Sequence, residues 1–313
     1  MADKENETID GSRRAALTGA AALGLGAATL AVTTGTAAAQ SAGDGELAGQ
    51  VALVTGGARA IGRAIALELA RMGADVAILD IADPDAISNI GYELASRADL
   101  DEAVALVAET GRKVVPIVAD IRSTEALREA AATIESEFGR PADIVAANAA
   151  IVPSAPLPEM TEQQWRDVMD VNLTGTGNTI RVFMPGMMER GRGRIIATAS
   201  TVGRHGSPNN AHYVASKWGV IGLVKSAAIA AGPSGVTVNA VNPTAVDSVR
   251  KPTGEALEQA NEALAGGYNA MDVAFLEPIE VAHAVAFLAS PRANFITGET
   301  IDVAAGANAR YTA

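Results

Sequence analysis

The feature that most limits the fold of this chain is an alternation of short apolar runs with amphipathic stretches, which begins near Glu46 and continues almost to the C-terminus. The apolar runs occupy 51–54, 76–80, 114–118, 144–147, 195–199 and 237–241, and 301–303 adds a candidate edge strand. Such runs are typical of strands buried on both faces, and each following stretch is long enough to cross over the sheet. The pattern therefore predicts an α/β fold, a Rossmann-type doubly wound parallel sheet, in one domain over 46–313.

Composition and charge exclude several classes of function. The 313 residues carry a net charge of −12 without any block of like charges, whereas neutralising phosphates requires clustered Lys and Arg. The chain has no Cys, which removes disulfides, thiolate metal ligands and cysteine nucleophiles, and no spaced set of His, Asp and Glu suggests a metal site. We expect a small-molecule partner and neither a nucleic acid nor a metal.

The N-terminal segment, 1–39, differs in composition from the rest of the chain. Arg13 and Arg14 precede a mildly apolar run rich in Ala, Gly and Thr, which ends in the small-residue pattern Ala37-Ala38-Ala39. The segment resembles a twin-arginine (Tat) export signal and implies a periplasmic or exported protein. A membrane anchor is one alternative, although the run has few of the Leu, Ile and Val residues that permanent spans prefer. A cytoplasmic protein with an N-terminal tail is the other.

The turn after the first predicted strand carries residues suited to a dinucleotide. It reads Thr-Gly-Gly-Ala-Arg-Ala-Ile-Gly and ends at Gly62, where a helix pattern begins. Glycines let the backbone approach a pyrophosphate at the helix N-terminus. Asp80 ends the next strand, where it would bind an adenosine ribose and repel a 2′-phosphate, whereas Arg59 would attract that phosphate. A fixed carboxylate close to the ribose should outweigh a mobile Arg59 that can instead face the pyrophosphate, so the turn predicts NAD rather than NADP. The alternative is a purely structural turn with a solvated Asp80.

A second group of residues, Ser200, Tyr213 and Lys217, suggests acid–base chemistry. Tyr213 and Lys217 are four residues apart, so on a helix they share a face, and a neighbouring ammonium lowers the pKa of a phenol. Tyr213 is therefore a candidate general acid or base, and Ser200, at the end of the fifth predicted strand, is placed to hold the substrate oxygen.

These motifs, in this order, resemble those of the short-chain dehydrogenase/reductase family over about Gly49 to Asn308. Ala60 replaces the middle glycine of the family's nucleotide turn, and Thr244 replaces the glycine of its Pro-Gly segment. The catalytic candidates are Ser200, Tyr213, Lys217 and, by resemblance alone, Asn172. The motifs and the resemblance together give the candidate cofactor-binding residues Gly56, Arg59, Ala60, Ile61, Gly62, Asp80, Asp120, Ile121, Asn148, Ala149, Tyr213, Lys217, Pro243, Val246 and Ser248.

The resemblance implies an NAD-dependent alcohol dehydrogenase or carbonyl reductase. In such a site Tyr213 would exchange the hydroxyl proton, Lys217 would lower its pKa and hold the nicotinamide ribose, and Ser200 would orient the substrate oxygen. Asn172 would fix a water that leads protons to solvent. An epimerase or dehydratase with a transient hydride is one alternative. A nucleotide-binding regulator is another, although it would not need an intact Ser–Tyr–Lys set. The resemblance also implies a homotetramer or homodimer.

The connection between the second and third predicted strands, 81–113, is longer than a simple crossover needs. We call this segment the insertion. It is expected beside the adenosine end of the cofactor, and it resembles the insertion of those short-chain dehydrogenases that hold NAD without exchange and depend on the peptide-derived carrier mycofactocin. An external redox carrier is then a further candidate partner. The alternative is a longer surface helix.

The remaining features are less informative. Residues 249–275, with Gly266 and Gly267 as a hinge, are predicted to form a lid over a moderately apolar substrate. His205 and His212 flank the site and are interpreted as solvated loop residues. Three methionines at helical spacing are interpreted as packing residues, namely Met184, Met187 and Met188.

Overall fold

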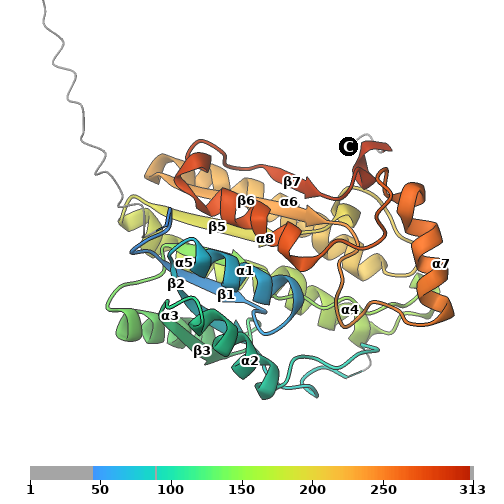
Figure 1. Ribbon diagram of the computed structural model, residues 1–313, viewed down its shortest axis with the longest axis horizontal. Helices are drawn as coiled ribbons and strands as arrows, with labels where there is room; N and C mark the ends of the chain where they lie inside the picture. The colour runs from blue at the N-terminus through green and yellow to red at the C-terminus, as the bar shows by residue number, and fades with distance from the viewer. Residues whose placement is uncertain (1–44, 89, 311–313) are drawn as a thin grey trace, which may run out of the picture. The chain divides into compact units, whose positions relative to one another are not determined.

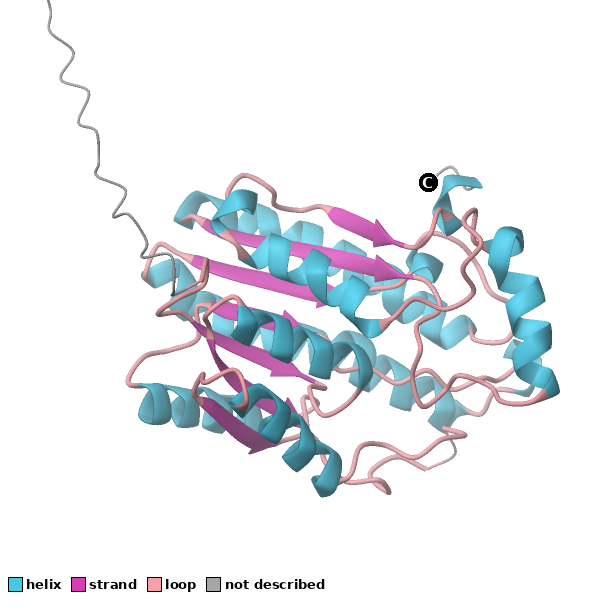
Figure 2. Cartoon of the chain, in the orientation of Figure 1, coloured by secondary structure: helices cyan, strands magenta, loops and turns pink. Residues whose placement is uncertain are grey.

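The computed structural model describes residues 45–310 except residue 89. The predicted export segment, 1–39, lies outside the described residues. Within the described part, seven strands form one sheet in the order β3-β2-β1-β4-β5-β6-β7, and all neighbouring strands are parallel. The arrowheads in Figure 2 accordingly point the same way. The strands are β1 (Val51–Thr55), β2 (Asp75–Asp80), β3 (Val114–Val118), β4 (Ile144–Ala147), β5 (Gly193–Thr198), β6 (Val236–Pro243) and β7 (Thr300–Val303).

The sheet confirms the predicted doubly wound parallel fold, including the edge strand β7. The longer helices are α1 (Ala60–Arg71), α2 (Arg97–Ala108), α3 (Thr124–Phe138), α4 (Glu162–Val168), the π-helical η2 (Met169–Gly175), α5 (Thr176–Glu189), α6 (Ala211–Ala231), α7 (Glu255–Ala263), the irregular η5 (Leu264–Tyr268) and α8 (Pro278–Ala289). Short 3-10 turns are η1 (Leu157–Glu159), η3 (Thr201–Gly203), η4 (Gly232–Ser234), η6 (Pro291–Ala293) and η7 (Ala307–Arg310).

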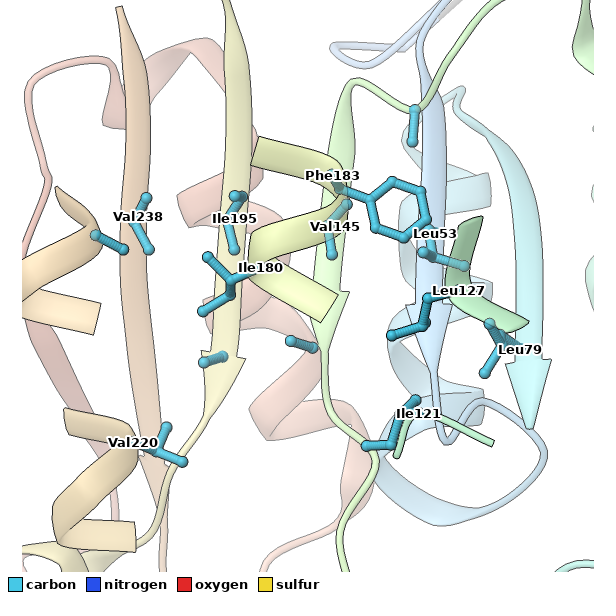
Figure 3. Packing of buried hydrophobic residues seen from close by; sticks show 14 of the residues in the cluster. Leu53, Leu79, Ile121, Leu127, Val145, Ile180, Phe183, Ile195, Val220 and Val238 are labelled. Atoms are coloured by element: carbon cyan, nitrogen blue, oxygen red, sulfur yellow. The ribbon is translucent and has the colours of Figure 1, made fainter. Parts of the chain in front are cut away.

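Two hydrophobic layers hold the helices on the sheet. Alternate residues of each strand face opposite sides, so Leu53 contributes to one layer and Val54 to the other. Helices α3, α5 and α6 cover the first face, and α1, α2 and α8 cover the second, with α1 and α8 turned toward the viewer in Figure 1. In Figure 3, Ile180 and Phe183 of α5 lie over Val145 and Ile195 of the central strands. Each such side chain contributes about 1.5–3 kcal/mol on burial.

Helix α6 is the one helix among the described residues that is apolar and long enough to cross a membrane, with a mean hydropathy of 1.3 over Ala211–Ser234. Its buried residues pack against β6 and α5 and include Lys217. Its apolar character is therefore explained by its place in the core. On its outer side Trp218 and Ile229 are exposed.

The arrangement that positions the site is the reversal of strand order at β1. This strand pairs with β2 on one side and with β4 on the other. The loops that follow β1 and β4 therefore run to opposite sides, and a crevice opens between them at the carboxyl ends of the two strands. Side chains that follow β1, β2, β3, β4, β5 and β6 converge there because all of these strands end at the same edge of the sheet.

Candidate active site

One cleft at the carboxyl edge of the sheet contains nearly all the predicted site residues. The predicted residues that line it are Gly56, Arg59, Ala60, Ile61, Gly62, Asp80, Asp120, Ile121, Asn148, Ala149, Ser200, Tyr213, Lys217, Pro243, Val246 and Ser248. Of the residues predicted for the site, Asn172 is the one that does not line the cleft. The fold thus brings together residues that are almost two hundred positions apart in the sequence.

The turn between β1 and α1 has no room for a side chain at Gly56 or Gly62. A methyl group at Gly56 would lie 2.7 Å from the Ala149 Cα, and one at Gly62 would lie 1.9 Å from the Gly56 carbonyl oxygen. Ala60 has a φ of 44°, a left-handed conformation that costs an alanine about 1 kcal/mol. The N-terminus of α1 has neither a side-chain cap nor an acidic residue in its first turn. Its N–H groups and positive dipole end therefore suit an anion such as a pyrophosphate.

Asp80, the last residue of β2, is 8% exposed and forms part of the cleft wall. Its carboxylate accepts the N–H of Ala58 at 3.1 Å and that of Ala82 at 3.2 Å. Burial raises the pKa of Asp80, while these hydrogen bonds and the charge of Arg59 act in the opposite direction. The interpretation of Asp80 as a solvated residue is wrong, because main-chain donors hold the carboxylate inside the cleft.

Arg59 is held by the insertion. Its guanidinium donates to the Leu94 carbonyl at 2.7 Å and to the Glu93 carbonyl at 3.1 Å, and its Nη2 lies 2.7 Å from Oδ2 of Asp99. The hydrogen bond from Arg59 is the main cause that holds the pKa of Asp99 well below its usual range. The sequence interpretation treated Arg59 as a mobile side chain facing the phosphates. That interpretation is wrong, because three acceptors from one segment fix the guanidinium.

The excess length of the insertion lies in an irregular segment, 81–96, that precedes α2. Ser96 and Asp99 form a capping box that begins α2, and the helix itself has 12 residues. The alternative of a longer surface helix is therefore wrong. Several residues of the irregular segment line the cleft, namely Ile81, Ile87, Tyr92, Glu93, Leu94 and Ala95.

Tyr92 carries the insertion beyond the adenosine end of the cleft. Its phenol oxygen accepts the Val152 N–H at 2.9 Å, on the segment that follows β4. Burial raises the pKa of Tyr92, and the Arg250 charge acts in the opposite direction. Tyr92 and Val152 line the same cleft as Tyr213, so the insertion reaches past the nucleotide turn to the segment that follows β4. The sequence placed it at the adenosine end only, because its length carries no information about where a single side chain docks.

Asn148 ties three strand ends together below the cleft. Its amide nitrogen donates to the carbonyls of Thr55 and Gly56 at 3.2 Å each, and its amide oxygen accepts the Thr198 hydroxyl at 3.1 Å. The neighbouring Ala149 donates its N–H to the Thr55 hydroxyl at 3.2 Å. Asn148 therefore sets the spacing between the nucleotide turn and the end of β5.

Asp120 follows β3 and is paired with a residue that the sequence analysis did not name. Its carboxylate accepts two bonds from the Arg122 guanidinium, at 2.7 and 2.6 Å, and the Arg122 N–H at 2.8 Å. The hydrogen bond to Asp120 is the main cause that raises the pKa of Arg122. Arg122 and Ile121 both line the cleft beside Asp120. An acidic residue two positions before an arginine was the available sequence signal for this pair.

Ser200, Tyr213 and Lys217 meet at one end of the cleft. Ser200 follows β5, while Tyr213 and Lys217 lie on one face of the first turns of α6. Ser200 hydrogen-bonds Tyr213, and the Lys217 ammonium lies 5.6 Å from the centre of the Tyr213 ring. Lys217 is 2% exposed and donates to the Thr198 carbonyl at 2.7 Å. The helical spacing alone predicted the Tyr–Lys contact, but only the packing of α6 against η3, which begins directly after Ser200, brings Ser200 to this pair.

The pKa values of the Tyr–Lys pair differ from the sequence expectation. Burial raises the pKa of Tyr213, whereas the charge of Arg250 and the hydrogen bond from Ser200 act in the opposite direction. Burial lowers the pKa of Lys217 to about 7. The lowering of the Tyr213 pKa that the spacing to Lys217 predicts therefore does not prevail over burial.

Asn172 lies in the π-helical segment η2 and is fully buried. Its amide oxygen accepts the Ile151 N–H at 2.8 Å, and its amide nitrogen donates to the Ile151 carbonyl at 2.8 Å and to the Ser216 hydroxyl at 3.3 Å. Its own carbonyl accepts the Thr176 hydroxyl at 2.7 Å. The side chain thus holds the segment after β4 against α6. The relay role expected for Asn172 stays a prediction.

The segment after β6 connects the cleft to the predicted lid. Thr244, which stands in the place of the family's glycine, donates its hydroxyl to the Asn269 amide oxygen at 3.0 Å. Asn269 is fully buried and donates in turn to the carbonyls of Val273 and Ala274 at 2.6 and 3.2 Å. Figure 1 shows α7 beyond the carboxyl ends of the strands. The hydroxyl of Thr244 therefore anchors the returning end of the lid, 249–275, a role that a glycine could not perform.

The two histidines near the site are more constrained than predicted. His205 is half-buried and its Nε2 lies 2.6 Å from the Tyr268 hydroxyl. His212 is fully buried, and its Nδ1 accepts the Tyr213 N–H at 2.9 Å. Burial lowers the pKa of His212. The interpretation of both as solvated loop residues is therefore wrong.

Met187 is fully buried in the core, as predicted for a packing residue. In the described part of the chain, no group of three or more His, Cys, Asp and Glu could hold a metal.

The comparisons with known proteins agree with the cleft. A family model described as enoyl-(acyl carrier protein) reductase matches residues 56–308. The (-)-trans-carveol dehydrogenase of Rhodococcus erythropolis is 38% identical over 277 residues, which covers 82% of this chain and 97% of that protein. A 3-oxoacyl-acyl-carrier-protein reductase of Staphylococcus epidermidis is 36% identical over 257 residues, covering 82% of this chain and 97% of the reductase.

A solved structure is also similar. Carveol dehydrogenase from Mycobacterium avium, in complex with NAD, superimposes with a TM-score of 0.79 and 34% identity. The match covers 85% of this chain and 100% of that one. The residues matched by the family model, 56–308, include every residue named above as lining the cleft. The chain therefore belongs to the short-chain dehydrogenase/reductase family of oxidoreductases.

Proposed function

We propose that this protein is an NAD-dependent dehydrogenase or reductase that interconverts a secondary alcohol and a ketone, or a similar carbonyl compound. The observation that carries the proposal is the convergence of Ser200, Tyr213 and Lys217 at one end of the cleft whose other end holds the nucleotide turn and Asp80. An acid–base group and a dinucleotide site in one cleft are the two requirements of hydride transfer to or from a carbinol carbon.

The residues present fit NAD. The uncapped N-terminus of α1 suits the pyrophosphate, and the close approach of Gly62 to the Gly56 carbonyl leaves the turn without a side chain that would block it. The Asp80 carboxylate uses one acceptor position on each oxygen for main-chain N–H groups and keeps others for ribose hydroxyls. Its charge would disfavour the 2′-phosphate of NADP. Arg59 is less suited to bind that phosphate, because its guanidinium is already paired with Asp99 and donates to the Leu94 carbonyl.

When bound, NAD supplies the hydride acceptor. The chain's own residues supply the proton chemistry and the alignment. Tyr213 would take the hydroxyl proton as an alcohol is oxidised, and would return it in the reverse direction. Ser200, already hydrogen-bonded to Tyr213, would hold the substrate oxygen. Lys217 would hold the nicotinamide ribose and stabilise the phenolate, and Asn172 would position the segment around Ile151. Such a proton transfer contributes roughly a hundredfold to ten-thousandfold in rate.

We further propose that NAD stays bound through many turnovers. The insertion is fixed at two places along the cleft, by the contacts of Arg59 with Leu94 and Asp99 and by the contact of Tyr92 with Val152. A segment held at both ends across a bound molecule slows its release, because these contacts must break first. A cofactor that does not leave requires a second redox carrier to collect the electrons in the site. We propose a carrier of the mycofactocin type for this role.

Two further proposals concern location and assembly. The twin-arginine segment supports export by the Tat route, which moves folded proteins and would keep a bound dinucleotide in place. Assembly into a homodimer or homotetramer is supported by exposed aromatic and aliphatic side chains, Trp218 and Ile229 on α6 and Trp165 on α4. Light scattering of the purified protein tests the second proposal, and a monomer at micromolar concentration would contradict it.

The principal experiment identifies the nucleotide and follows its redox state. Purified protein is denatured, and the released nucleotide is identified and quantified. We expect about one NAD per chain, a single round of reduction when a secondary alcohol is added, and continued turnover only with an artificial electron acceptor. The Tyr213→Phe variant should retain the nucleotide and lose activity by roughly a hundredfold or more. Activity within tenfold of wild type would remove Tyr213 from the acid–base role. Nucleotide-free protein that turns over on added NAD would contradict the proposed retention of NAD, but not the proposed reaction.

A further inference from the structure

Arg250 occupies the catalytic end of the cleft on the segment that follows β6. It lines the same cleft as Ser200 and Tyr213, and its neighbours Ser248 and Val249 line it too. The side chain is exposed, and its main-chain N–H donates to the Ser248 hydroxyl at 3.3 Å. Nothing in the mechanism described above uses this arginine. Its location places a permanent positive charge in the cleft that contains Ser200 and Tyr213.

The other cations of the cleft are already matched by acceptors. Arg59 is paired with Asp99 and Arg122 with Asp120, at 2.7 and 2.6 Å. The Lys217 ammonium donates to a carbonyl at 2.7 Å. By contrast, in residues 45–310 apart from residue 89, the guanidinium of Arg250 has no ion pair or side-chain hydrogen bond.

The carboxylate nearest to Arg250 along the chain is also engaged. Asp247 is bound by the adjacent Lys251 at 2.5 Å, and the Lys251 ammonium lies 5.5 Å from the centre of the Phe275 ring. The two neighbouring cations of this segment therefore differ. Lys251 is neutralised within the lid segment, whereas Arg250 is left for a partner from outside the chain.

The charge of Arg250 acts at the reacting end of the cleft. Burial raises the pKa of both Tyr213 and Tyr92, and Arg250 opposes this rise in each case. Burial, with a smaller contribution from the Arg250 charge, lowers the pKa of Lys217 to about 7. The guanidinium is thus within electrostatic reach of the catalytic pair. Because Arg250 and Tyr213 line the same cleft, the guanidinium can contact a substrate whose hydroxyl lies on Tyr213.

We propose that Arg250 binds a carboxylate of the substrate, so that the preferred substrates are secondary alcohols or ketones that carry a carboxylate on the same molecule. This inference rests on the proposed function. A guanidinium offers a planar fork of N–H donors that matches a carboxylate with two parallel hydrogen bonds. A chain with a net charge of −12 repels anions over most of its surface, so a local cation is needed to receive one. Apolar residues that line the cleft, Ile151, Val152 and Val249, would hold the body of such a substrate.

The test compares charged substrates with matched neutral ones. The substrates are straight-chain acids of increasing length that carry a secondary hydroxyl group, together with their methyl esters. Each is oxidised in the presence of both added NAD and an artificial electron acceptor. The assay then works whether or not NAD leaves the site. For the best chain length, we expect kcat/KM of the wild type to be roughly tenfold higher for the acid than for the ester. The KM of the acid should rise with ionic strength, because the contact is partly exposed.

The variants separate Arg250 from its neighbour. Arg250→Met should abolish the preference through a higher KM for the acid, while any change in kcat caused by the altered charge near Tyr213 should be the same for acid and ester. Arg250→Lys should keep part of the preference, since it retains the charge without the fork. Lys251→Met, which removes a similar charge one residue away, should leave the preference for the acid over the ester unchanged.

An unchanged preference in Arg250→Met would overturn the inference, as would an equal loss in Lys251→Met. Weaker NAD binding in Arg250→Met with no change in preference would assign the arginine to the cofactor and also overturn it. Absence of turnover with both acids and esters would instead contradict the proposed function. Turnover of both with equal kcat/KM in the wild type would overturn this inference alone.

Discussion

Arg59 and Asp99 form an ion pair of 2.7 Å that joins the nucleotide turn to the first turn of α2. The two residues are 40 positions apart, and both side chains are about three-quarters buried. Because Asp99 also accepts the Ser96 N–H at 2.8 Å, one carboxylate both begins the helix and fastens the insertion to the cofactor site. The pair therefore links the position of the insertion to that of the nucleotide turn.

The ion pair predicts a slow release of NAD that depends on Asp99. Asp99→Asn should speed NAD dissociation by roughly tenfold to a hundredfold, because a charge-assisted hydrogen bond that closes the insertion is weakened. The rate is measured by displacing bound NAD with an excess of labelled NAD. Asp101→Asn is the matched control, since Asp101 forms an exposed ion pair with Arg97 on the same helix. Equal rates in both variants would show that the insertion does not retain the cofactor.

The choice of cofactor is predicted to depend on Asp80. Asp80→Asn keeps the size of the side chain and removes the charge that repels a 2′-phosphate, so discrimination against NADP should fall by roughly tenfold. Relative Kd values for the two nucleotides provide the measurement. Asp83→Asn, an exposed residue three positions later, should leave them unchanged. A wild-type protein that already prefers NADP would refute the weight given to Asp80.

The left-handed conformation of Ala60 predicts a stabilising substitution. Ala60→Gly should raise the free energy of unfolding by about 0.5–1 kcal/mol, because glycine adopts a φ of 44° without steric cost, while part of the gain is lost to chain entropy. Ala64→Gly in the middle of α1 is the control and should lower it by about 1 kcal/mol. Urea denaturation checks both values. A loss of stability in Ala60→Gly similar to that in Ala64→Gly would refute the strain at this position.

Lys217 predicts a pH dependence of stability. Its pKa in the folded protein is about 7, below the ordinary value of 10.5, so between these values the unfolded chain binds more protons than the folded one. The contribution of this residue to the free energy of unfolding should therefore rise with pH from about 7 upward, by at most about 1.4 kcal/mol per pH unit. Urea denaturation of wild type and Lys217→Met at several pH values isolates the effect. Parallel pH profiles for the two proteins would show that Lys217 titrates normally.

Export is predicted to depend on the arginine pair of the N-terminal segment. Replacing Arg13 and Arg14 by Lys keeps the charge and removes the feature that the Tat machinery reads, so the protein should accumulate in the cytoplasm. Cell fractionation and activity in each fraction provide the measurement. The single substitution Lys4→Arg serves as the control and should not affect delivery. Unchanged delivery of the double variant would point to a different route.

Most of the fold could be predicted from the sequence because its signals are local. Strands buried on both faces read as apolar runs, and all seven predicted runs are strands in the structure. The nucleotide turn and the Tyr213–Lys217 spacing are likewise local, since a turn and a single helical repeat fix their geometry. These patterns, in this order, also support the family resemblance from which the site residues were predicted. Sixteen of the predicted residues line one cleft.

The tertiary structure alone decided which side chains meet across distant segments. The sequence does not reveal that Arg59 is fixed, because its partners Leu94 and Asp99 lie 35 and 40 positions away along the chain. The pKa of Tyr213 rises because burial depends on the whole packing of α6, which helical spacing does not report. In the sequence, Thr244 is only a replacement for the glycine of the family's Pro-Gly segment. The structure shows that its hydroxyl donates to the Asn269 side chain. A local pattern specifies backbone conformation, whereas burial and partner choice depend on contacts between residues far apart in the chain.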